Sequence, residues 1–535
     1  MNKPEISPAI SELIKVFQDQ RGFDAFKTAK EDPRIKTHET VAKAAFMYEK
    51  VRNAIDYQEE HLIRKNSIAR MLKRRILMRE RGTNIAEPLI RELIRAGYLK
   101  NDYFPVARIP DIERIINKYV LLTKLSSEQQ LDYKSRQRLF KWIISVASFE
   151  LEEYLNPSIK DDALVECMYK VIRPQIDISE EIPNQEDQDI QIYIAIHKAL
   201  IKSDASMLRY HLIHYYAPGW RYATTAEIPT YATYLPGLVN HIEQQINNLT
   251  ADRLFRYVRR FAPIFITLRD VLNEHAEHMD QVLADPKKFD IAIRQAIDKR
   301  YRDASTRLSR GVVRSIIYIF LTKTIMAFLL ELPYEAVFLH TVKITPLAIN
   351  VIFHPILMFL IATSIRVPAA ENTTRITLGI NEVVYNPPER EILGTREERI
   401  RTSGVLNAVF TAFYGLAFII TFGGIIWLLK SLQFSIVSAF LFLFFLSVIS
   451  FFGLRLRHNA MEMVMVNKRQ GAGAILFEFF ALPVLRAGRW ISGKTSQINV
   501  FLFILDFIIE APFKVLIETV EDWVSFQRAK KDEII

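Results

Sequence analysis

The sequence contains little cysteine and little glycine, and it lacks the short motifs that identify a chemical reaction. Cys167 is the single cysteine among 535 residues, so no disulfide can form within the chain. The 17 glycines offer few places where the backbone could closely surround a phosphate. No Gly-rich phosphate loop, Gly-x-Ser-x-Gly elbow or protein-kinase motif set is present. We therefore expect no cofactor, and an enzyme is the less favoured class of function.

Charge is absent from two long stretches in the second half of the chain. No residue between Arg401 and Lys430 is charged, and none between Lys430 and Arg455 is charged. Because a helix rises 1.5 Å per residue, about 20 apolar residues cross the hydrocarbon core of a bilayer. These stretches predict two membrane spans, at 403–429 and 432–454, joined by a tight turn.

Two further spans are predicted before this pair. Residues 344–365 form a long apolar stretch, in which Pro355 removes one helical hydrogen bond that a helix bundle can tolerate. Residues 311–330 are less clearly a span, because they contain Arg314 and Lys323. The arginine can reach the membrane interface, but a lysine near the middle of a span costs roughly 2.5–3.5 kcal/mol.

The basic residues around this predicted transmembrane region, 311–455, alternate in a way that defines its orientation. Lysine and arginine are frequent before the first span, in the loop at 367–402 and after the fourth span. The two short turns contain only Lys343 and Lys430. Because cytoplasmic loops carry an excess of lysine and arginine, the pattern predicts a multi-pass protein of the cell membrane. Both termini and the long loop would lie in the cytoplasm.

Strand-like composition occurs within the predicted cytoplasmic loop. Thr374–Leu378 and Glu382–Tyr385 lie on either side of Gly379, and two prolines follow. Short runs of this composition, bounded by glycine and proline, are typical of paired strands. We therefore predict a small β-hairpin at the membrane surface.

The final segment, 456–535, remains apolar but becomes amphipathic. Its first part, Gly473–Trp490, is predicted to be broken by Pro483. From Gln497 onward, charged residues recur at every fourth position, at Asp506, Glu510, Lys514, Glu518 and Asp522. That spacing predicts a helix with one charged stripe, which lies in the membrane interface or packs on the bundle. A fifth span with a polar stripe stays open as the alternative.

The first part of the chain, 1–310, has the charge and the helical spacing of a water-exposed domain. Apolar residues recur three and four positions apart, and strand-like runs are scarce. Segments near 173–189 and 217–237 mark two internal boundaries, and the last helix, near 287–310, is expected to continue into the first span. Together these patterns predict an all-α fold, with a multi-helix cytoplasmic domain, a four-helix transmembrane bundle and amphipathic C-terminal helices.

A strongly basic segment lies in this first part, in a chain whose formal net charge is +10. Between Arg64 and Arg81 there are eight basic residues and one acidic residue, with apolar residues interleaved. The favoured interpretation is a solvated charged face on a core helix. The functional alternative is a membrane-surface patch for anionic lipid headgroups, formed by Arg70, Lys73, Arg74, Arg75 and Arg79, and contact with nucleic acid is the least favoured.

Two His-x-x-His pairs are weak candidates for metal ligands. They are His211 with His214 and His275 with His278, and the members of each pair would share one helix face. A metal site needs three or four convergent ligands, and neither a His-Glu-x-x-His motif nor paired Glu-x-x-His motifs are present. We therefore predict no metal site and interpret these histidines as surface or core residues.

The most informative ionisable residues lie within or beside the predicted spans. Lys323 and His354 are the intramembrane polar candidates, and Glu331 and Glu335 follow the lysine. An ionisable group inside a span is a functional hypothesis by default, because its burial in hydrocarbon is costly. These residues either pair structurally across the bundle or take part in the movement of ions or protons.

This body plan favours an anchoring, scaffolding or assembly role at the cytoplasmic face of the membrane. The cytoplasmic part is large, the external turns are short, and spans two to four contain no charge near the middle. The expected partners are the bilayer with its anionic headgroups, and other proteins or further copies of the chain. A transporter or channel subunit is the first alternative, based on Lys323, His354 and the striped tail. A membrane-bound enzyme acting on lipid or peptide is the second.

Overall fold

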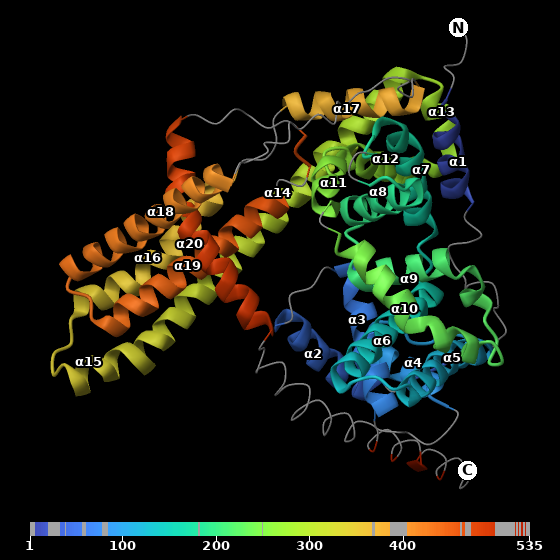
Figure 1. Ribbon diagram of the computed structural model, residues 1–535, viewed down its shortest axis with the longest axis horizontal. Coiled ribbons are helices and arrows are strands. Elements are labelled where there is room, and N and C mark those ends of the chain that lie inside the picture. The colour runs from blue at the N-terminus through green and yellow to red at the C-terminus, as the bar shows by residue number, and fades with distance from the viewer. Residues whose placement is uncertain are drawn as a thin grey trace. The chain divides into compact units, whose positions relative to one another are not determined.

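The computed structural model is helical throughout the residues that it describes (Figure 1). These are residues 6–19, 33–37, 39–55, 60–77, 84–179, 182–248, 250–365, 370–385, 404–460, 463–465 and 472–497, with positions 519, 523, 526, 527 and 530. Among them there is no β-strand, and one isolated bridge joins Arg34 and Pro105. The all-α prediction is confirmed.

The chain divides into two compact units. The first combines residues 1–7 with 260–499 and contains four helices that are long and apolar enough to cross a membrane, so we call it the membrane unit. The second combines residues 8–259 with 500–535, and we call it the helical unit. Four apolar helices of this length indicate a membrane protein, as the charge-free stretches predicted.

The helical unit is organised around α6 (Tyr133–Leu155), which packs against α3, α5 and α9. Large side chains such as Trp142 and Phe149 of α6 are almost fully buried in these contacts. The helices that accompany α6 are α1 (Pro8–Gln18), α2 (Glu39–Ile55), α3 (Glu60–Leu77), α4 (Ala86–Arg95), α5 (Ile109–Glu128), α7 (Ile159–Ile172), α8 (Gln185–Leu200), α9 (Ala205–Tyr216), α10 (Ile228–Ile246) and α11 (Ala251–Val258).

Local side chains determine where several of these helices begin and end. Asp132 accepts hydrogen bonds from two backbone N–H groups in the first turn of α6, and Asp204 accepts one from Met207 in α9. Such caps satisfy N–H groups that have no partner within the helix. After α4, Gly97 has a φ of +79°, a conformation that glycine adopts without strain.

The two predicted internal boundaries are connections within the helical unit. Residues 173–189 contain a 3-10 turn, Arg173–Gln175, and the Arg173 guanidinium donates to Asp189 in α8. Residues 217–237 contain a second 3-10 turn, η4 (Pro218–Tyr222), and the first part of α10. Helices α7 and α8, on either side of the first connection, pack against each other.

In the membrane unit, the predicted continuity between the last helix of the first part and the first span is confirmed. Helix α14 runs unbroken from Pro286 to Met326, and a π-helical turn, η6 (Ala327–Glu331), joins it to α15. The helices of this unit are α12 (Ala262–His275), α13 (Met279–Leu283), α14, α15 (Leu332–Phe338), α16 (Ile344–Ser364), α17 (Ala370–Tyr385), α18 (Gly404–Ser431), α19 (Ile436–Ala460) and α20 (Ala472–Gln497).

Helix α16 connects the packing of the apolar helices, because it contacts both α14 and α19. Helix α20 packs against α19 and α18. The candidate membrane spans are the helices over Pro286–Phe338, Ile344–Ser364, Thr411–Ser431 and Ile436–His458. Three of these helices, α14, α16 and α19, pack against one another, and the candidate functional site lies between them.

The β-hairpin predicted in the loop after α16 is wrong, because residues 370–385 form one helix, α17. Its buried apolar residues recur three or four positions apart, at Ile376, Ile380, Val383 and Val384. This face packs against α12 and α14. At Gly379 the approach is so close that an added Cβ would lie 2.5 Å from Ile264 of α12. Packing against neighbouring helices therefore outweighs the strand preference of the β-branched residues.

The break predicted at Pro483 is also wrong, since α20 continues through this proline from Ala472 to Gln497. A proline removes one backbone N–H donor, but a helix that packs against neighbours can keep its direction across the gap. Helices α18 and α19 supply such packing. The residues of the predicted charged stripe, from Asp506 to Asp522, lie outside the described part of the chain.

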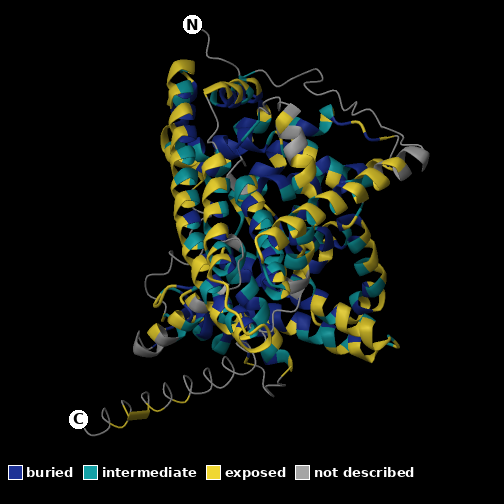
Figure 2. Ribbon diagram, turned by 90° about the vertical axis from the view of Figure 1, so that its left-hand side faces the viewer, coloured by how far each residue is buried: buried dark blue, intermediate teal, exposed yellow. Residues whose placement is uncertain are grey.

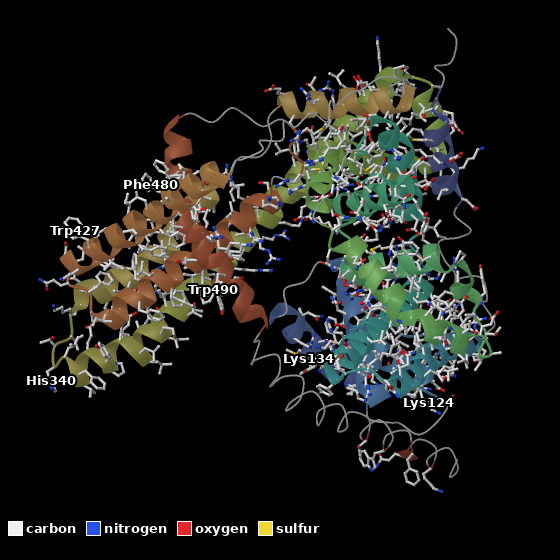
Figure 3. All side chains as sticks on the ribbon, in the orientation of Figure 1. Lys124, Lys134, His340, Trp427, Phe480 and Trp490 are labelled. Atoms are coloured by element: carbon white, nitrogen blue, oxygen red, sulfur yellow. The ribbon has the colours of Figure 1, made fainter. Side chains whose placement is uncertain are left out.

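Apolar side chains are exposed along the long helices of the membrane unit. Figure 2 shows exposed residues along much of their length, and the exposed set includes Ile419 of α18 at 72%. Trp427 of α18 and Trp490 of α20 are 70% and 66% exposed (Figure 3). A helix in water would place polar groups on such surfaces, whereas lipid tails accept apolar ones and tryptophan is enriched near membrane interfaces.

A close crossing of α19 and α20 gives a test of this packing. An added Cβ at Gly488 would lie 2.0 Å from the Ser447 carbonyl oxygen, whereas nothing lies within 4 Å of such a Cβ at Gly424 of α18. Both Gly→Ala changes raise helix propensity, by about 1 kcal/mol. We expect Gly488→Ala to lower the stability by about 1–3 kcal/mol through overpacking. Gly424→Ala should be neutral or stabilising. Thermal unfolding of the two variants in detergent measures the difference, and equal effects on stability would contradict the close crossing at Gly488.

Candidate functional site in the membrane helices

The first contribution to the site is a buried stripe along α14, η6 and α15. Ile319, Lys323, Ala327, Glu331 and Glu335 are four residues apart, and all five are buried. Residues at this spacing share one helix face. The π-helical turn precedes Pro333, which has no backbone N–H and whose ring would crowd a regular helical turn. The wider turn ends at Glu331 and keeps this carboxylate on the buried face.

The second contribution is a matching stripe along α16. Pro346, Asn350, His354 and Met358 are again four residues apart, and they are the buried residues of this helix. The sequence predicted a role for His354 but gave no role to Asn350. An asparagine in the middle of an apolar span is itself a polar group that needs a partner, and this signal was present in the sequence.

Asn350 is the centre of a hydrogen-bonded network that joins three helices. The Lys323 Nζ donates to the Asn350 Oδ1 at 2.6 Å, and the Asn350 Nδ2 donates to the Glu331 Oε1 at 2.6 Å. The same amide nitrogen lies 3.3 Å from the carbonyl oxygen of Ser438 in α19. The amide thus bridges an ammonium and a carboxylate that make no direct contact with each other.

Ser438 and Glu335 extend the network toward the connection between α15 and α16. The Ser438 hydroxyl donates to the Glu331 Oε2 at 3.0 Å, and it lies 3.5 Å from the Glu335 Oε1. The other oxygen of Glu335 accepts the backbone N–H of Lys343 at 3.0 Å. Lys343 ends a short connection whose residues are exposed, His340 among them (Figure 3). Glu335 is therefore the member of the network nearest to the outside of the helices.

His354 occupies the other end of the network. Its Nδ1 lies 3.0 Å from the Asn350 carbonyl oxygen, and its Nε2 lies 3.2 Å from the Phe442 carbonyl oxygen in α19. A carbonyl oxygen only accepts hydrogen bonds, so each ring nitrogen needs a hydrogen atom to make its contact. A neutral ring can make one of the two bonds, and a protonated ring can make both.

Beyond His354 the space between the helices is filled by apolar side chains. Val312, Ile319, Met358 and Ile449 form a buried cluster from α14, α16 and α19. Phe445 packs on this cluster, and the Lys323 Nζ lies 4.3 Å from the centre of its ring. The polar network therefore reaches the exposed connection at one end and meets an apolar seal at the other.

The histidine pairs predicted as weak metal candidates lie elsewhere. His211 and His214 lie in α9, while His275 ends α12 and His278 lies in the short 3-10 turn after it. The ring of His211 lies 4.7 Å from the ring of His197 in α8, tilted by 47°. Within the described residues, no group of three or more histidine, cysteine or acidic side chains is placed to hold a metal ion. Neither pair therefore gains a further ligand there.

The buried histidines of α8 and α9 predict a loss of stability in acid. Burial, followed by the charge of His214, lowers the pKa of His211 to about 4, and burial also lowers the pKa of His197. In the unfolded chain, these histidines bind protons near the ordinary histidine pKa of about 6.5. Stability should therefore fall as pH decreases from about 6.5 to about 4, by ~3 kcal/mol for His211 alone.

Thermal unfolding of the purified chain across this pH range measures the effect. His211→Gln should flatten the decline, because the replacement cannot take up a proton. A decline with an unchanged slope in this variant would show that His211 does not contribute.

The basic patch predicted at the membrane surface lies partly on α3. Three of its arginines bind carboxylates of the helical unit, in the pairs Arg70–Glu49, Arg74–Glu92 and Arg75–Glu92. Lys73 is exposed, and Arg79 lies outside the described residues. Contact with anionic lipid stays a prediction, for which Lys73 is the accessible cation in the described part of the patch.

No known protein family, curated protein or solved structure matches this chain. The functional conclusion therefore depends on the geometry of the chain's own residues.

The network itself predicts an unusual pattern of stability changes. Lys323→Met leaves Glu331 buried without its counter-charge, and breaking a buried charge pair typically costs about 3–5 kcal/mol. The double variant, Lys323→Met with Glu331→Leu, removes the carboxylate that the single variant leaves without its counter-charge, and replacing a buried charge pair by apolar residues is often close to neutral. Glu335 keeps its bonds to Ser438 and to the Lys343 N–H. We expect the double variant to unfold at a higher temperature than the single one in detergent. Additive losses would contradict coupling between the two residues.

Proposed function

We propose that this protein moves protons across the membrane through the network around Asn350. The observation that carries the proposal is the convergence of four ionisable side chains, Lys323, Glu331, Glu335 and His354, with two neutral polar ones, Asn350 and Ser438, in the buried space between α14, α16 and α19. Each of the six side chains is at most 2% exposed. Proton relays inside membranes are typically built from such acidic and histidine side chains.

An anchoring role alone would not require this arrangement. Helices in a bilayer associate well through small residues and neutral polar groups such as serine and asparagine. Charged groups there are costly, and Lys323, Glu331 and Glu335 add three of them. The sequence favoured anchoring because spans two to four lack charge, but Asn350 and His354 of α16 and Ser438 of α19 give the interior a polar lining.

The geometry supports a stepwise path for the proton. A proton arriving from the exposed connection is taken up by Glu335, the outermost carboxylate. The Ser438 hydroxyl, 3.5 Å from Glu335 and 3.0 Å from Glu331, passes it on by accepting one proton and releasing its own. Lys323, held by Asn350, limits the accumulation of charge when the carboxylates ionise. His354 lies next to the apolar seal, and its ring nitrogens face backbone carbonyl oxygens, which carry no transferable proton, so it takes up the proton only when water enters the network.

Release on the opposite side requires the apolar seal to open. Val312, Ile319, Met358 and Ile449 come from three helices, so a small separation of α14, α16 and α19 would admit water. Closing the path at Glu335 in that state would give alternating access to the two sides. The wild-type chain should therefore move protons at the rate of a carrier, not of an open pore.

Proton movement into liposomes is the direct test. The purified chain is reconstituted with a pH-sensitive dye inside, and a potassium diffusion potential drives protons inward. We expect acidification that depends on the protein, with Glu331→Gln and Lys323→Met slower by about tenfold or more, a loss of at least ~1.4 kcal/mol of barrier lowering. Lys430→Met is the matched control, because Lys430 is exposed at the end of α18.

Two results would remove the proposal. One is wild-type liposomes that acidify no faster than empty ones. The other is equal flux in Lys323→Met and Lys430→Met liposomes. Capture of a defined protein partner by a chain without flux would favour the anchoring role that the sequence alone predicts.

A further inference from the structure

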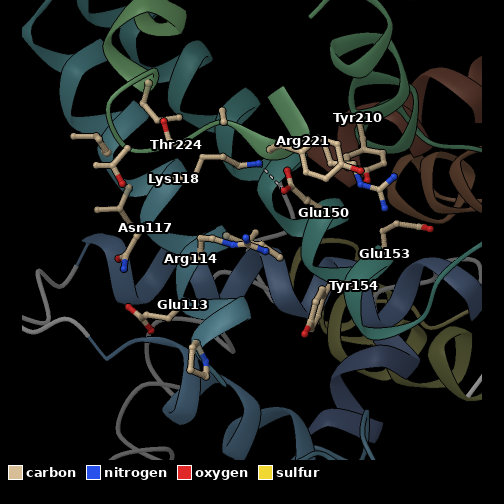
Figure 4. Close-up of a pocket in the computed structure, with 18 of the residues that line it drawn as sticks. Glu113, Arg114, Asn117, Lys118, Glu150, Glu153, Tyr154, Tyr210, Arg221 and Thr224 are labelled. Atoms are coloured by element: carbon tan, nitrogen blue, oxygen red, sulfur yellow. Dashed lines mark hydrogen bonds and ion pairs between the residues drawn. The ribbon is translucent and has the colours of Figure 1, made fainter. Parts of the chain in front are cut away.

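The helical unit contains a cavity that the proposed proton path does not use. It has a volume of about 1380 Å³ and lies between α5, the C-terminal part of α6, the start of α7 and the connection from η4 to α10 (Figure 4). Pockets for small molecules usually enclose about 300–1,000 Å³, so the space is sufficient for a molecule of nucleotide size. Apolar side chains such as Ile115, Leu121 and Ile228 form part of its wall.

One cation of the cavity is already neutralised. The Lys118 Nζ lies 2.6 Å from the Glu150 Oε1, and both side chains are buried. The second oxygen of Glu150 accepts the Tyr119 hydroxyl. This carboxylate therefore has a partner at each oxygen and is not available to the other cations of the wall.

Two arginines of the wall are not neutralised in the same way. The Arg114 side chain is 77% exposed, and its ion pair in the described structure is a long one, 4.0 Å to Asp111. Asp111 is itself bound by the Tyr154 hydroxyl at 2.7 Å. Arg221 forms no ion pair with a described residue. Arg114, Lys118 and Arg221 line the same cavity, and both guanidinium groups help to lower the pKa of Lys118, after burial as the main cause.

Arg221 is held in place by its neighbour Trp220. This indole is fully buried, its Nε1 donates to the Tyr119 hydroxyl at 3.1 Å, and its ring packs edge-on at 5.2 Å from Tyr231. A Cβ at Gly219 would lie 2.7 Å from the Tyr231 hydroxyl, so the turn is tightly packed. The connection that carries Arg221 is therefore fixed before any ligand arrives, which reduces the entropy lost on binding.

The acidic side of the cavity carries less charge near neutral pH than its composition implies. Ser158 links Glu153 and Asp162, with its hydroxyl 2.8 Å from the first carboxylate and 3.2 Å from the second. Burial, followed by the charge of Glu153, raises the pKa of Asp162 to about 7. Asp162 is therefore partly protonated near neutral pH. The wall has five basic side chains and four acidic ones, so the balance of charge in the cavity is positive.

We propose that this cavity binds a small organic anion, whose phosphate or carboxylate group is held by Arg114 and Arg221 and whose ring packs on the tyrosines of the wall. Guanidinium groups bind both kinds of oxyanion through paired hydrogen bonds. Tyr154 and Tyr222 line the same space and offer ring faces for the rest of the ligand. The binding needs no proton flux, so it is independent of the function proposed above.

Titration of the purified full-length chain with three probes tests the proposal. The probes are inorganic phosphate, adenosine monophosphate and benzoate, and the dissociation constants are measured by calorimetry. We expect adenosine monophosphate or benzoate to bind, and Arg114→Gln with Arg221→Gln to weaken binding by about tenfold or more. Arg138→Gln is the matched control, since Arg138 is an exposed arginine of α6 outside the cavity wall. Unchanged thermal unfolding would show that the variants are folded.

The choice of probe identifies the source of the oxyanion. Tighter binding of adenosine monophosphate indicates a phosphate ligand, and tighter binding of benzoate indicates a carboxylate ligand. The proposal is overturned if none of the probes binds to the wild-type chain, or if the double variant binds as tightly as Arg138→Gln.

The pH dependence of binding gives a second readout. Protonation of Asp162 removes negative charge from the cavity, so benzoate, whose charge is the same at pH 6 and pH 8, should bind more tightly at pH 6. The groups that interact electrostatically with Asp162 are Glu153, Asp161, Tyr193, Tyr210 and Arg221. Tighter binding of benzoate at pH 8 would contradict a binding position beside Asp162.

Discussion

The membrane unit depends on one constraint, which is that hydrocarbon offers no hydrogen-bond partners. Lys323 and Glu331 lie on one helix face where water cannot reach them, so their partners must come from the neighbouring helices. Asn350 meets this need because its amide has both a donor and an acceptor. Its oxygen binds the ammonium and its nitrogen binds the carboxylate, each at 2.6 Å. The alignment of α14 with α16 follows from these two bonds.

Several local features are consequences of the same constraint. The π-helical turn before Pro333 keeps Glu331 on the buried face, and the four-residue spacing of the stripe on α16 brings His354 to the same side as Asn350. Helix α19 supplies the Ser438 hydroxyl and two backbone carbonyl oxygens. A network with so many partners holds three helices in register, and it also contains the groups that a proton relay needs. Structural pairing and proton movement are therefore compatible roles for these residues.

The helical unit shows how charges behave where water is within reach. Lys118 and Glu150 are buried and paired, whereas Arg114 is exposed and has a single long ion pair in the described structure. An exposed guanidinium can remain hydrated until an anion replaces the water, so it costs little to leave it without a close carboxylate. The same residue type inside the membrane unit would need a full set of partners. Buried Trp220 and exposed Arg221 are adjacent, so the backbone that carries this arginine is fixed beside an open cavity.

The membrane character, the all-α fold and the continuity of α14 with the first span could all be predicted from the residues alone. These features depend on the presence or absence of charge along a continuous stretch, and a stretch can be recognised without its neighbours. The sequence also identified Lys323, Glu331, Glu335 and His354 as the residues of interest.

Only the tertiary structure assigned Asn350 and Ser438 as their partners. These contacts join residues 27 and 107 positions apart, and they depend on which helix faces meet. The hairpin predicted at 374–385 was wrong for the same reason, because the contacts of α17 with α12 and α14 decide its conformation. The cavity beside Arg114 and Arg221 is likewise a product of helix packing, since its walls come from segments more than a hundred residues apart, whose approach no local pattern encodes.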